Sequence, residues 1–211
     1  MASIQEISTA IETGKIKTIH DLVLSAIHEG IDPMKILNDG MIQAMEMIGE
    51  RFSRGEAFVP EMLISARTMK KGVEVLKPYL TGGAAASLGK VIIGTVSGDI
   101  HDIGKNLVAM MLESSGFEVI DLGIDVSSER FIQTIQENES VRIVALSTLL
   151  TTTMPAMRQI VDELNHLEAR SKFRVMVGGA PITEEFARSI GADGYTADAA
   201  SAASMAKSFA V

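Results

Sequence analysis

The chain has 211 residues, of which 46% are hydrophobic, and it is therefore long and apolar enough to bury a core in one large domain or two modest ones. Its formal net charge of −8 argues against nucleic acid as a partner, because phosphate binding needs clustered lysine and arginine. The chain has no cysteine, which excludes disulfides, iron–sulfur ligation and thiol nucleophiles within it.

The N-terminal segment contains Glu6 and Glu12 and lacks the apolar core of a signal peptide. No long apolar run follows it. We therefore expect a cytoplasmic location and no membrane partner.

Residues 1–80 are expected to form a helical domain. Apolar residues recur at helical spacing in four stretches. Asp32 and Pro33 are typical of a helix start, Gly55 breaks the third stretch, and Pro60 opens the fourth. Four amphipathic helices joined by short loops predict a small antiparallel bundle.

Residues 81–89 are rich in glycine and alanine and are interpreted as a linker. A flexible linker of this length reaches about 15 Å.

Residues 90–211 alternate between strand and helix patterns. The expected strands are 91–96, 118–122, 143–147, 174–177 and 194–196, and the expected helices lie near 105–115, 128–137, 154–168, 183–190 and 198–208. Short apolar strands separated by helices predict an α/β domain, with a flavodoxin-like, doubly wound, parallel five-stranded sheet covered on both faces.

The most informative stretch, residues 98–106, follows the first of these strands and reads Gly-Asp-Ile-His-Asp-Ile-Gly-Lys-Asn. It places His101 on the loop at the carboxyl end of that strand, between Asp99 and Asp102 and ahead of Gly104. Open α/β sheets bind their ligands at this edge. His101 could also merely cap the following helix or lie in a polar loop.

Two other chemistries are considered for the same stretch. A phosphate-binding loop fails because five residues separate Gly98 from Gly104 where four are required, and because Asn106 replaces the Ser or Thr that holds magnesium. A non-haem iron or zinc site built on His101, Asp99 and Asp102 is conceivable, although no second histidine is near in sequence.

The spacing Asp-x-His-x-x-Gly and its preceding strand resemble the cobalt-binding signature of cobalamin-binding domains. Over about residues 3–208, the chain resembles the corrinoid methyl-carrier proteins of methyltransferase systems and the cobalamin-binding region of methionine synthase. The resemblance implies a cobalamin or related corrinoid cofactor, with His101 as the lower axial cobalt ligand. Asp99 would hold the other ring nitrogen. Thr153 would complete a His101–Asp99–Thr153 relay at a position where the family has serine, and proton uptake by the departing histidine would couple to methyl transfer.

The resemblance implies further cofactor contacts. Asp102, Ile103 and Gly104 belong to the signature itself. Small and hydroxylated residues after the third and fourth strands would form a slot for the lower nucleotide tail: Ser147, Leu149, Thr151, Gly178, Gly179, Tyr195 and Ala199. A helical-domain segment resembles the cap over the upper face of the corrin, through Phe52, Val59, Met62 and Leu63. Taken singly, these residues could instead form a tight turn or pack the bundle.

The function implied is that of a carrier subunit in one-carbon metabolism, not catalytic alone. A substrate-specific methyltransferase would load the methyl group, a second would pass it to an acceptor such as tetrahydrofolate or coenzyme M, and a reductive activation protein would restore the cofactor. The methyl donor stays open among methanol, methylamines, glycine betaine-like compounds and aryl methyl ethers. The alternative is an adenosylcobalamin-binding sensor, which is disfavoured because the chain lacks tryptophan and has no room for a DNA-binding segment.

Overall fold

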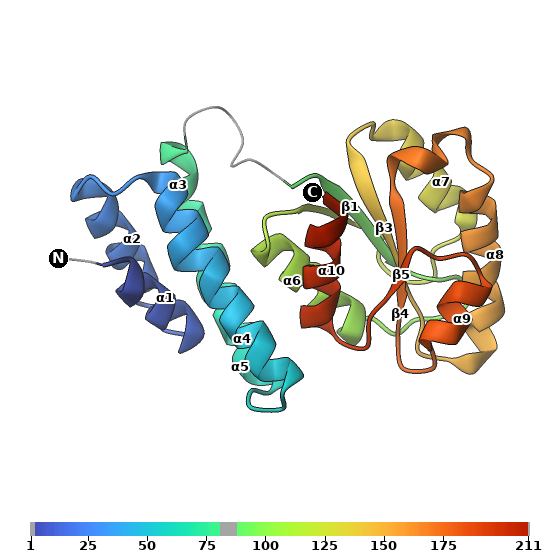
Figure 1. Cartoon of the computed structure of the whole chain (residues 1–211), viewed down its shortest axis with the longest axis horizontal. Helices are drawn as coiled ribbons and strands as arrows, with labels where there is room; N and C mark the ends of the chain where they lie inside the picture. The colour runs from blue at the N-terminus through green and yellow to red at the C-terminus, as the bar shows by residue number, and fades with distance from the viewer. Residues whose placement is uncertain (1–2, 81–87, 211) are drawn as a thin grey trace. The chain divides into compact units, whose positions relative to one another are not determined.

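The computed structural model describes residues 3–80 and 88–210. They form an N-terminal helical unit and a C-terminal unit that contains the sheet (Figure 1). Most of the expected linker, residues 81–87, lies outside the described residues, and the domain boundaries at 80 and 90 stay predictions. Within the described ranges, the helices lack the combination of length and apolar character that a membrane crossing requires.

Two helices of the N-terminal unit begin at typical capping residues, Ser3 and Asp32. Ser3 caps the first helix, since its Oγ accepts the N–H of Glu6 at 3.2 Å while the Glu6 carboxylate accepts the N–H of Ser3 at 2.7 Å. The helices are α1 (Ile4–Glu12), α2 (Ile19–His28), α3 (Pro33–Lys35), α4 (Gln43–Ser53) and α5 (Val59–Leu76), followed by a short 3₁₀ turn, η2 (Lys77–Tyr79).

The third expected helix is interrupted. A π-helical segment, η1 (Ile36–Ile42), joins α3 to α4. Within it Asp39 and Gly40 are poor helix formers. A Cβ added to Gly40 would lie 3.4 Å from the side chain of Ile4, so this segment also approaches α1 closely. The core of the unit consists of buried aliphatic and methionine side chains, among them Ile7, Ile11, Ile19, Val23, Met41, Met45, Ile48, Met62 and Met69.

The C-terminal unit contains a five-stranded, fully parallel sheet with strand order β2-β1-β3-β4-β5. The strands are β1 (Lys90–Thr95), β2 (Glu118–Asp121), β3 (Val141–Ser147), β4 (Arg174–Gly178) and β5 (Gly194–Tyr195). This order is the flavodoxin-like, doubly wound arrangement, and it confirms the expected fold class.

Helices cover both faces of the sheet (Figure 1). They are α6 (Ile103–Ser114), α7 (Ser128–Glu137), α8 (Met154–Asn165), α9 (Glu184–Ser189) and α10 (Ala199–Ala210), with 3₁₀ turns η3 (Thr151–Thr153) and η4 (Glu168–Lys172) on either side of α8. Alternate residues of β1 point to opposite faces, so Val91 and Ile93 pack with α6 and α10, whereas Ile92 packs with α7 and α8. The helix expected over 154–168 ends earlier, because Leu167 has an extended backbone that separates α8 from η4.

The strand order creates one switch point. From β1 the chain crosses to β2 on one side and then returns to β3 on the other. Ligands of open α/β sheets bind in the crevice outside the carboxyl ends of the strands at such a point. The loop that contains His101 leaves β1 there.

Candidate functional site

The loop after β1 is held by its own backbone and by the strand that precedes it. The N–H of Asp99 donates to the carbonyl oxygen of Val96 at 3.1 Å. The Thr95 hydroxyl donates to the carbonyl oxygen of His101 at 2.8 Å. These bonds close a tight turn between β1 and α6, so the histidine is presented from a fixed backbone.

Asp99 and His101 form the centre of the site. Asp99 is fully buried, and its Oδ1 accepts the His101 backbone N–H at 3.0 Å and lies 2.7 Å from His101 Nδ1. A carboxylate in this position makes Nδ1 the protonated ring nitrogen, which leaves the lone pair on Nε2. The histidine side chain is 46% exposed. His101 can therefore offer one neutral imidazole nitrogen to a metal from outside.

The second oxygen of Asp99 is bound by residues that follow β3. Oδ2 accepts the Leu149 N–H at 2.6 Å and the Thr148 hydroxyl at 2.8 Å. Thr153, the predicted relay residue, lies farther away, with its Oγ1 3.4 Å from Oδ2. The two threonine oxygens are 2.5 Å apart, and Thr153 Oγ1 is also 3.0 Å from the carbonyl oxygen of Leu150.

This geometry adds a residue, Thr148, to the predicted relay. The Thr148 hydroxyl donates to Asp99 Oδ2 at 2.8 Å, while Thr153 Oγ1 lies 2.5 Å from Thr148 Oγ1 and farther from the carboxylate, at 3.4 Å. The sequence reasoning missed Thr148. The available signal was its position directly after β3, the strand that pairs with β1.

The contacts of Asp99 decide its charge. Burial alone would raise the pKa of this carboxyl, but the backbone and side-chain donors described above outweigh it and hold the pKa well below the usual aspartate value. Asp99 is therefore an anion, and both of its carboxylate oxygens accept hydrogen bonds.

Large apolar side chains are exposed on the loops around His101. Ile100 and Ile103 are 71% and 82% exposed, and Leu149 and Leu150 after β3 and Ile124 after β2 are exposed as well. Exposed apolar groups gathered at one edge mark a surface for a ligand or partner. Ile103 and Leu149 are predicted cofactor contacts, whereas Ile124 was missed.

The predicted tail-binding residues differ in what they can offer. Ser147 is half-buried and Thr151 is exposed. A Cβ on Gly178 would meet only the carbonyl oxygen of Thr196, at 3.7 Å, which leaves open space beside it. At Gly179, with φ of 126°, a Cβ would lie 1.7 Å from the Thr148 carbonyl oxygen, so this glycine is required by the close approach of two chain segments.

The remaining predicted residues lie in different surroundings. Asp102 and Gly104 are exposed beside His101, and Asp102 accepts a bond from Asn106. Tyr195 packs against the core, and Ala199 is buried, so its side chain offers little surface. In the N-terminal unit, Phe52 and Leu63 are half-buried and Val59 is exposed. Met62 is fully buried and belongs to the bundle core, and the placement of all four over a corrin stays a prediction.

The iron or zinc alternative is wrong. Among residues 3–80 and 88–210, no group of three or more histidine, aspartate or glutamate side chains could hold a metal ion. His101 is thus suited to a metal whose other ligands come from elsewhere, as from a macrocycle. The single imidazole, the exposed apolar side chains around it and the space beside Gly178 all fit a corrinoid.

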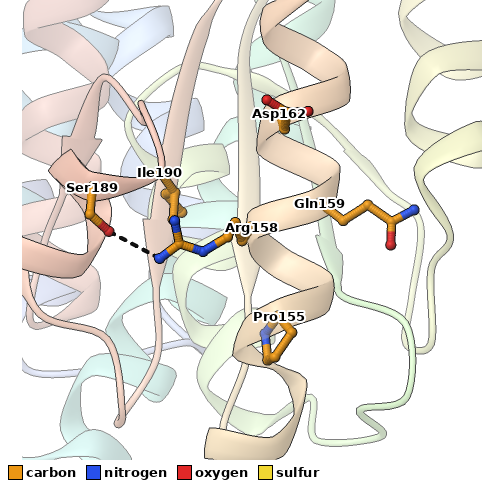
Figure 2. A pocket seen from close by; sticks show the side chains of 6 residues that line it. All are labelled: Pro155, Arg158, Gln159, Asp162, Ser189 and Ile190. Carbon is orange, nitrogen blue, oxygen red and sulfur yellow. Dashed lines mark hydrogen bonds between the residues drawn. The ribbon is translucent and has the colours of Figure 1, made fainter.

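A surface groove elsewhere in the C-terminal unit contains none of the predicted residues. It measures about 340 Å³, lies between α8 and α9, and is lined by Pro155, Arg158, Gln159, Asp162, Ser189 and Ile190. Figure 2 shows the Arg158 guanidinium reaching across it to the Ser189 hydroxyl, at 3.2 Å. The guanidinium also stacks over the Phe186 ring, at 5.4 Å from the ring centre, so Arg158 already has partners within the protein.

Comparisons with known proteins agree with this geometry. The B12 binding domain matches residues 89–204, and a second B12 binding domain matches residues 3–77. The chain is 39% identical to dimethylamine corrinoid protein 1 of Methanosarcina acetivorans over 208 residues, which cover 97% of this chain and 95% of the relative.

Two solved structures are similar over almost the whole chain. One is a cobalamin-binding protein from Desulfitobacterium hafniense DCB-2, with a TM-score of 0.84, 30% identity and 99% of each chain covered. The other is the methanol:cobalamin methyltransferase complex MtaBC from Methanosarcina barkeri, with a TM-score of 0.83, 29% identity, and coverage of 98% of this chain and 79% of the other.

Proposed function

Since this chain belongs to the family of B12-binding corrinoid proteins, we propose that it carries a methyl group on a corrinoid between two methyltransferases. The bound corrinoid supplies a cobalt that accepts the methyl group and gives it up, while the protein supplies ligation, orientation and shielding. The observation that carries the proposal is the buried Asp99 bound to the exposed ring of His101.

We assign His101 as the residue that would hold the corrinoid cobalt, through its Nε2. Asp99 would fix the tautomer by accepting the Nδ1–H at 2.7 Å. If His101 released the cobalt, its Nε2 would be free to take up a proton, and the Asp99 carboxylate beside Nδ1 would balance the positive ring. Thr148 and Thr153 keep that carboxylate oriented throughout.

The other predicted contacts are part of the same proposal. Ile103 and Leu149 would lie against the corrin, and the space beside Gly178 would admit the nucleotide tail. Val59 and the half-buried Phe52 and Leu63 would shield the upper face.

The names of the relatives support a proposal for the methyltransferase that loads the methyl group. Relatives of this chain are a dimethylamine and a trimethylamine corrinoid protein, at 39% and 42% identity. The similar solved complex contains a methanol:cobalamin methyltransferase. We therefore propose a methylamine methyltransferase as the donor-side partner, a second methyltransferase to coenzyme M or tetrahydrofolate, and a reductive activation protein.

The test is the absorption spectrum of the full chain mixed with methylcobalamin, compared with His101→Ala. We expect a histidine-ligated spectrum for the wild type and its loss in the variant. His166→Ala is the matched control, because His166 is an exposed histidine at the C-terminal end of α8. Failure of the wild type to bind methylcobalamin, or an unchanged spectrum in His101→Ala, would contradict the proposal.

A second experiment tests the partner. The chain is loaded with unmethylated cobalamin, which a chemical reductant brings to the cobalt(I) state. It is then incubated with a purified methylamine methyltransferase and its amine, or with the methanol enzyme and methanol, and the absorption spectrum follows methylation. Loading with dimethylamine or trimethylamine is expected. Loading only with methanol and its methyltransferase would show that the proposed donor class is wrong.

A further inference from the structure

Asp125, in the loop between β2 and α7, has a backbone conformation that aspartate adopts rarely. Its φ is 51°, and among the described residues other than glycine it is the only one with positive φ. Such a conformation costs energy in a residue with a side chain, and it persists where surrounding contacts compensate. The contacts of Asp125 therefore need an explanation.

Both the side chain and the backbone of Asp125 bind the loop that leads to His101. Its Oδ1 accepts the N–H of Gly98 at 2.7 Å and the Ser97 hydroxyl at 3.4 Å. Its own N–H donates to the carbonyl oxygen of Asp99 at 3.0 Å. One residue thus holds the chain on both sides of the Gly98–Asp99 peptide.

The loop that carries Asp125 is itself anchored to β1. The Thr95 N–H donates to the Gly123 carbonyl oxygen at 3.0 Å, and the Val126 N–H donates to the Thr95 carbonyl oxygen at 2.9 Å. Asp125 lies between these bonds, so its carboxylate has a fixed position. Gly98 has a φ of 81° and, as a glycine, can adopt many other backbone conformations. The hydrogen bond from its N–H to Asp125 restricts that freedom.

We propose that Asp125 is a positioning residue for the cobalt ligand, acting through the backbone of Gly98 and Asp99. This inference rests on the proposed function. The Asp99–His101 contact is 2.7 Å long and depends on where the backbone places Asp99. Without the hydrogen bond from the Gly98 N–H to Asp125, the turn could move and Asp99 could shift. The Nδ1–H of His101 would then be bound less firmly.

The test separates positioning from folding with Asp125→Gly and Asp125→Asn in the full chain. Glycine removes the carboxylate but accepts positive φ without strain, and asparagine keeps an acceptor and tolerates the same φ. The control is Asp32→Ala, which removes a carboxylate that accepts the Met34 N–H in the N-terminal unit. Thermal unfolding verifies that each variant folds.

Two measurements are made on each variant. In the protein without cofactor, the ¹⁵N shifts of the His101 ring report which nitrogen carries the proton. With methylcobalamin, a titration gives the dissociation constant and the spectrum gives the histidine-ligated fraction. For Asp125→Gly we expect mixed tautomers and affinity weakened about tenfold, the lower end of what a lost contact to a ligating histidine costs. Asp125→Asn and Asp32→Ala should resemble the wild type.

A failure of the positioning inference can be distinguished from a failure of the proposed function. Wild-type ¹⁵N shifts and affinity in Asp125→Gly would overturn the positioning inference, while a histidine-ligated wild type would leave the proposed function intact. If the wild type binds no corrinoid, the proposed function fails, and the ¹⁵N shifts alone still decide whether Asp125 sets the tautomer. Loss of ligation in Asp125→Asn would also overturn the inference, because the acceptor is retained there.

Discussion

Replacing Thr148 by valine is expected to destabilise the C-terminal unit by about 2 kcal/mol. The change keeps the shape of the side chain and removes the hydroxyl that donates to Asp99 Oδ2 at 2.8 Å. A hydrogen bond to a charged acceptor contributes about 1.5–3 kcal/mol, and the Leu149 N–H, 2.6 Å from the same oxygen, remains.

Thr153→Val is the matched comparison. Its hydroxyl is 3.4 Å from Asp99 Oδ2, and we expect a cost of about 1 kcal/mol. Urea unfolding of the full chain without cofactor, followed by circular dichroism, gives both values. A larger cost for Thr153→Val than for Thr148→Val would refute the expectation that Thr148 is the stronger partner of Asp99.

A double-mutant cycle with Asp99→Asn tests the contact itself. Because a neutral amide accepts a weaker bond than a carboxylate, the valine change at Thr148 should cost less in the Asn background, with a coupling energy of about 1 kcal/mol. Additive effects would show that Thr148 stabilises the unit through packing alone.

Further predictions concern stability and its dependence on pH. Gly179→Ala should destabilise the protein by more than about 3 kcal/mol, since its Cβ would meet a backbone oxygen at 1.7 Å, whereas Gly178→Ala should cost about 1 kcal/mol or less; thermal unfolding compares the two. Asp121→Asn should lower the free energy of unfolding more than Lys105→Met does. In Asp121→Asn the buried Lys105, 2.5 Å from that carboxylate, loses its counter-charge, whereas methionine suits the buried position. Urea unfolding midpoints of the two variants decide the order. The stability advantage of the wild type over Asp99→Asn should be full above about pH 4, the ordinary value for aspartate, and should shrink as the pH falls further, since the pKa of Asp99 is lowered in the folded state; a constant difference down to about pH 2 would contradict this.

The sequence predicts the part of the site that is local. Asp99 and His101 are two residues apart on one turn, so the motif and the strand before it suffice to place them together. The sheet was predictable for a related reason, because alternating strands and helices leave few right-handed parallel arrangements.

The hydroxyl that binds Asp99 was not predictable in the same way. Four threonines follow β3 within six residues, and each offers a hydroxyl: Thr148, Thr151, Thr152 and Thr153. Which of them reaches the carboxylate depends on the register between β1 and β3, where Thr95 pairs with Ser147, and on the 3₁₀ turn that follows. A shift of one residue would turn a side chain to the other face.

The sequence did not reveal which of the predicted cofactor contacts are buried in the protein core. Ala199 and Met62 match positions that contact the cofactor in the resemblance, yet both side chains are buried in their own units. Small or flexible apolar residues suit a ligand slot and a packed core equally well, so composition alone does not separate the two.

The long span of the Asp99 contacts has a consequence for biosynthesis. The carboxylate meets its partners on Thr148, Leu149 and Thr153 across 49 to 54 positions of the chain. A nascent chain that ends at β2 already contains the histidine, but the groups that hold Asp99 in place have not yet been translated. Under the proposed function, a corrinoid would therefore find His101 held in place by Asp99 only after β3 and η3 have left the ribosome and β3 has paired with β1.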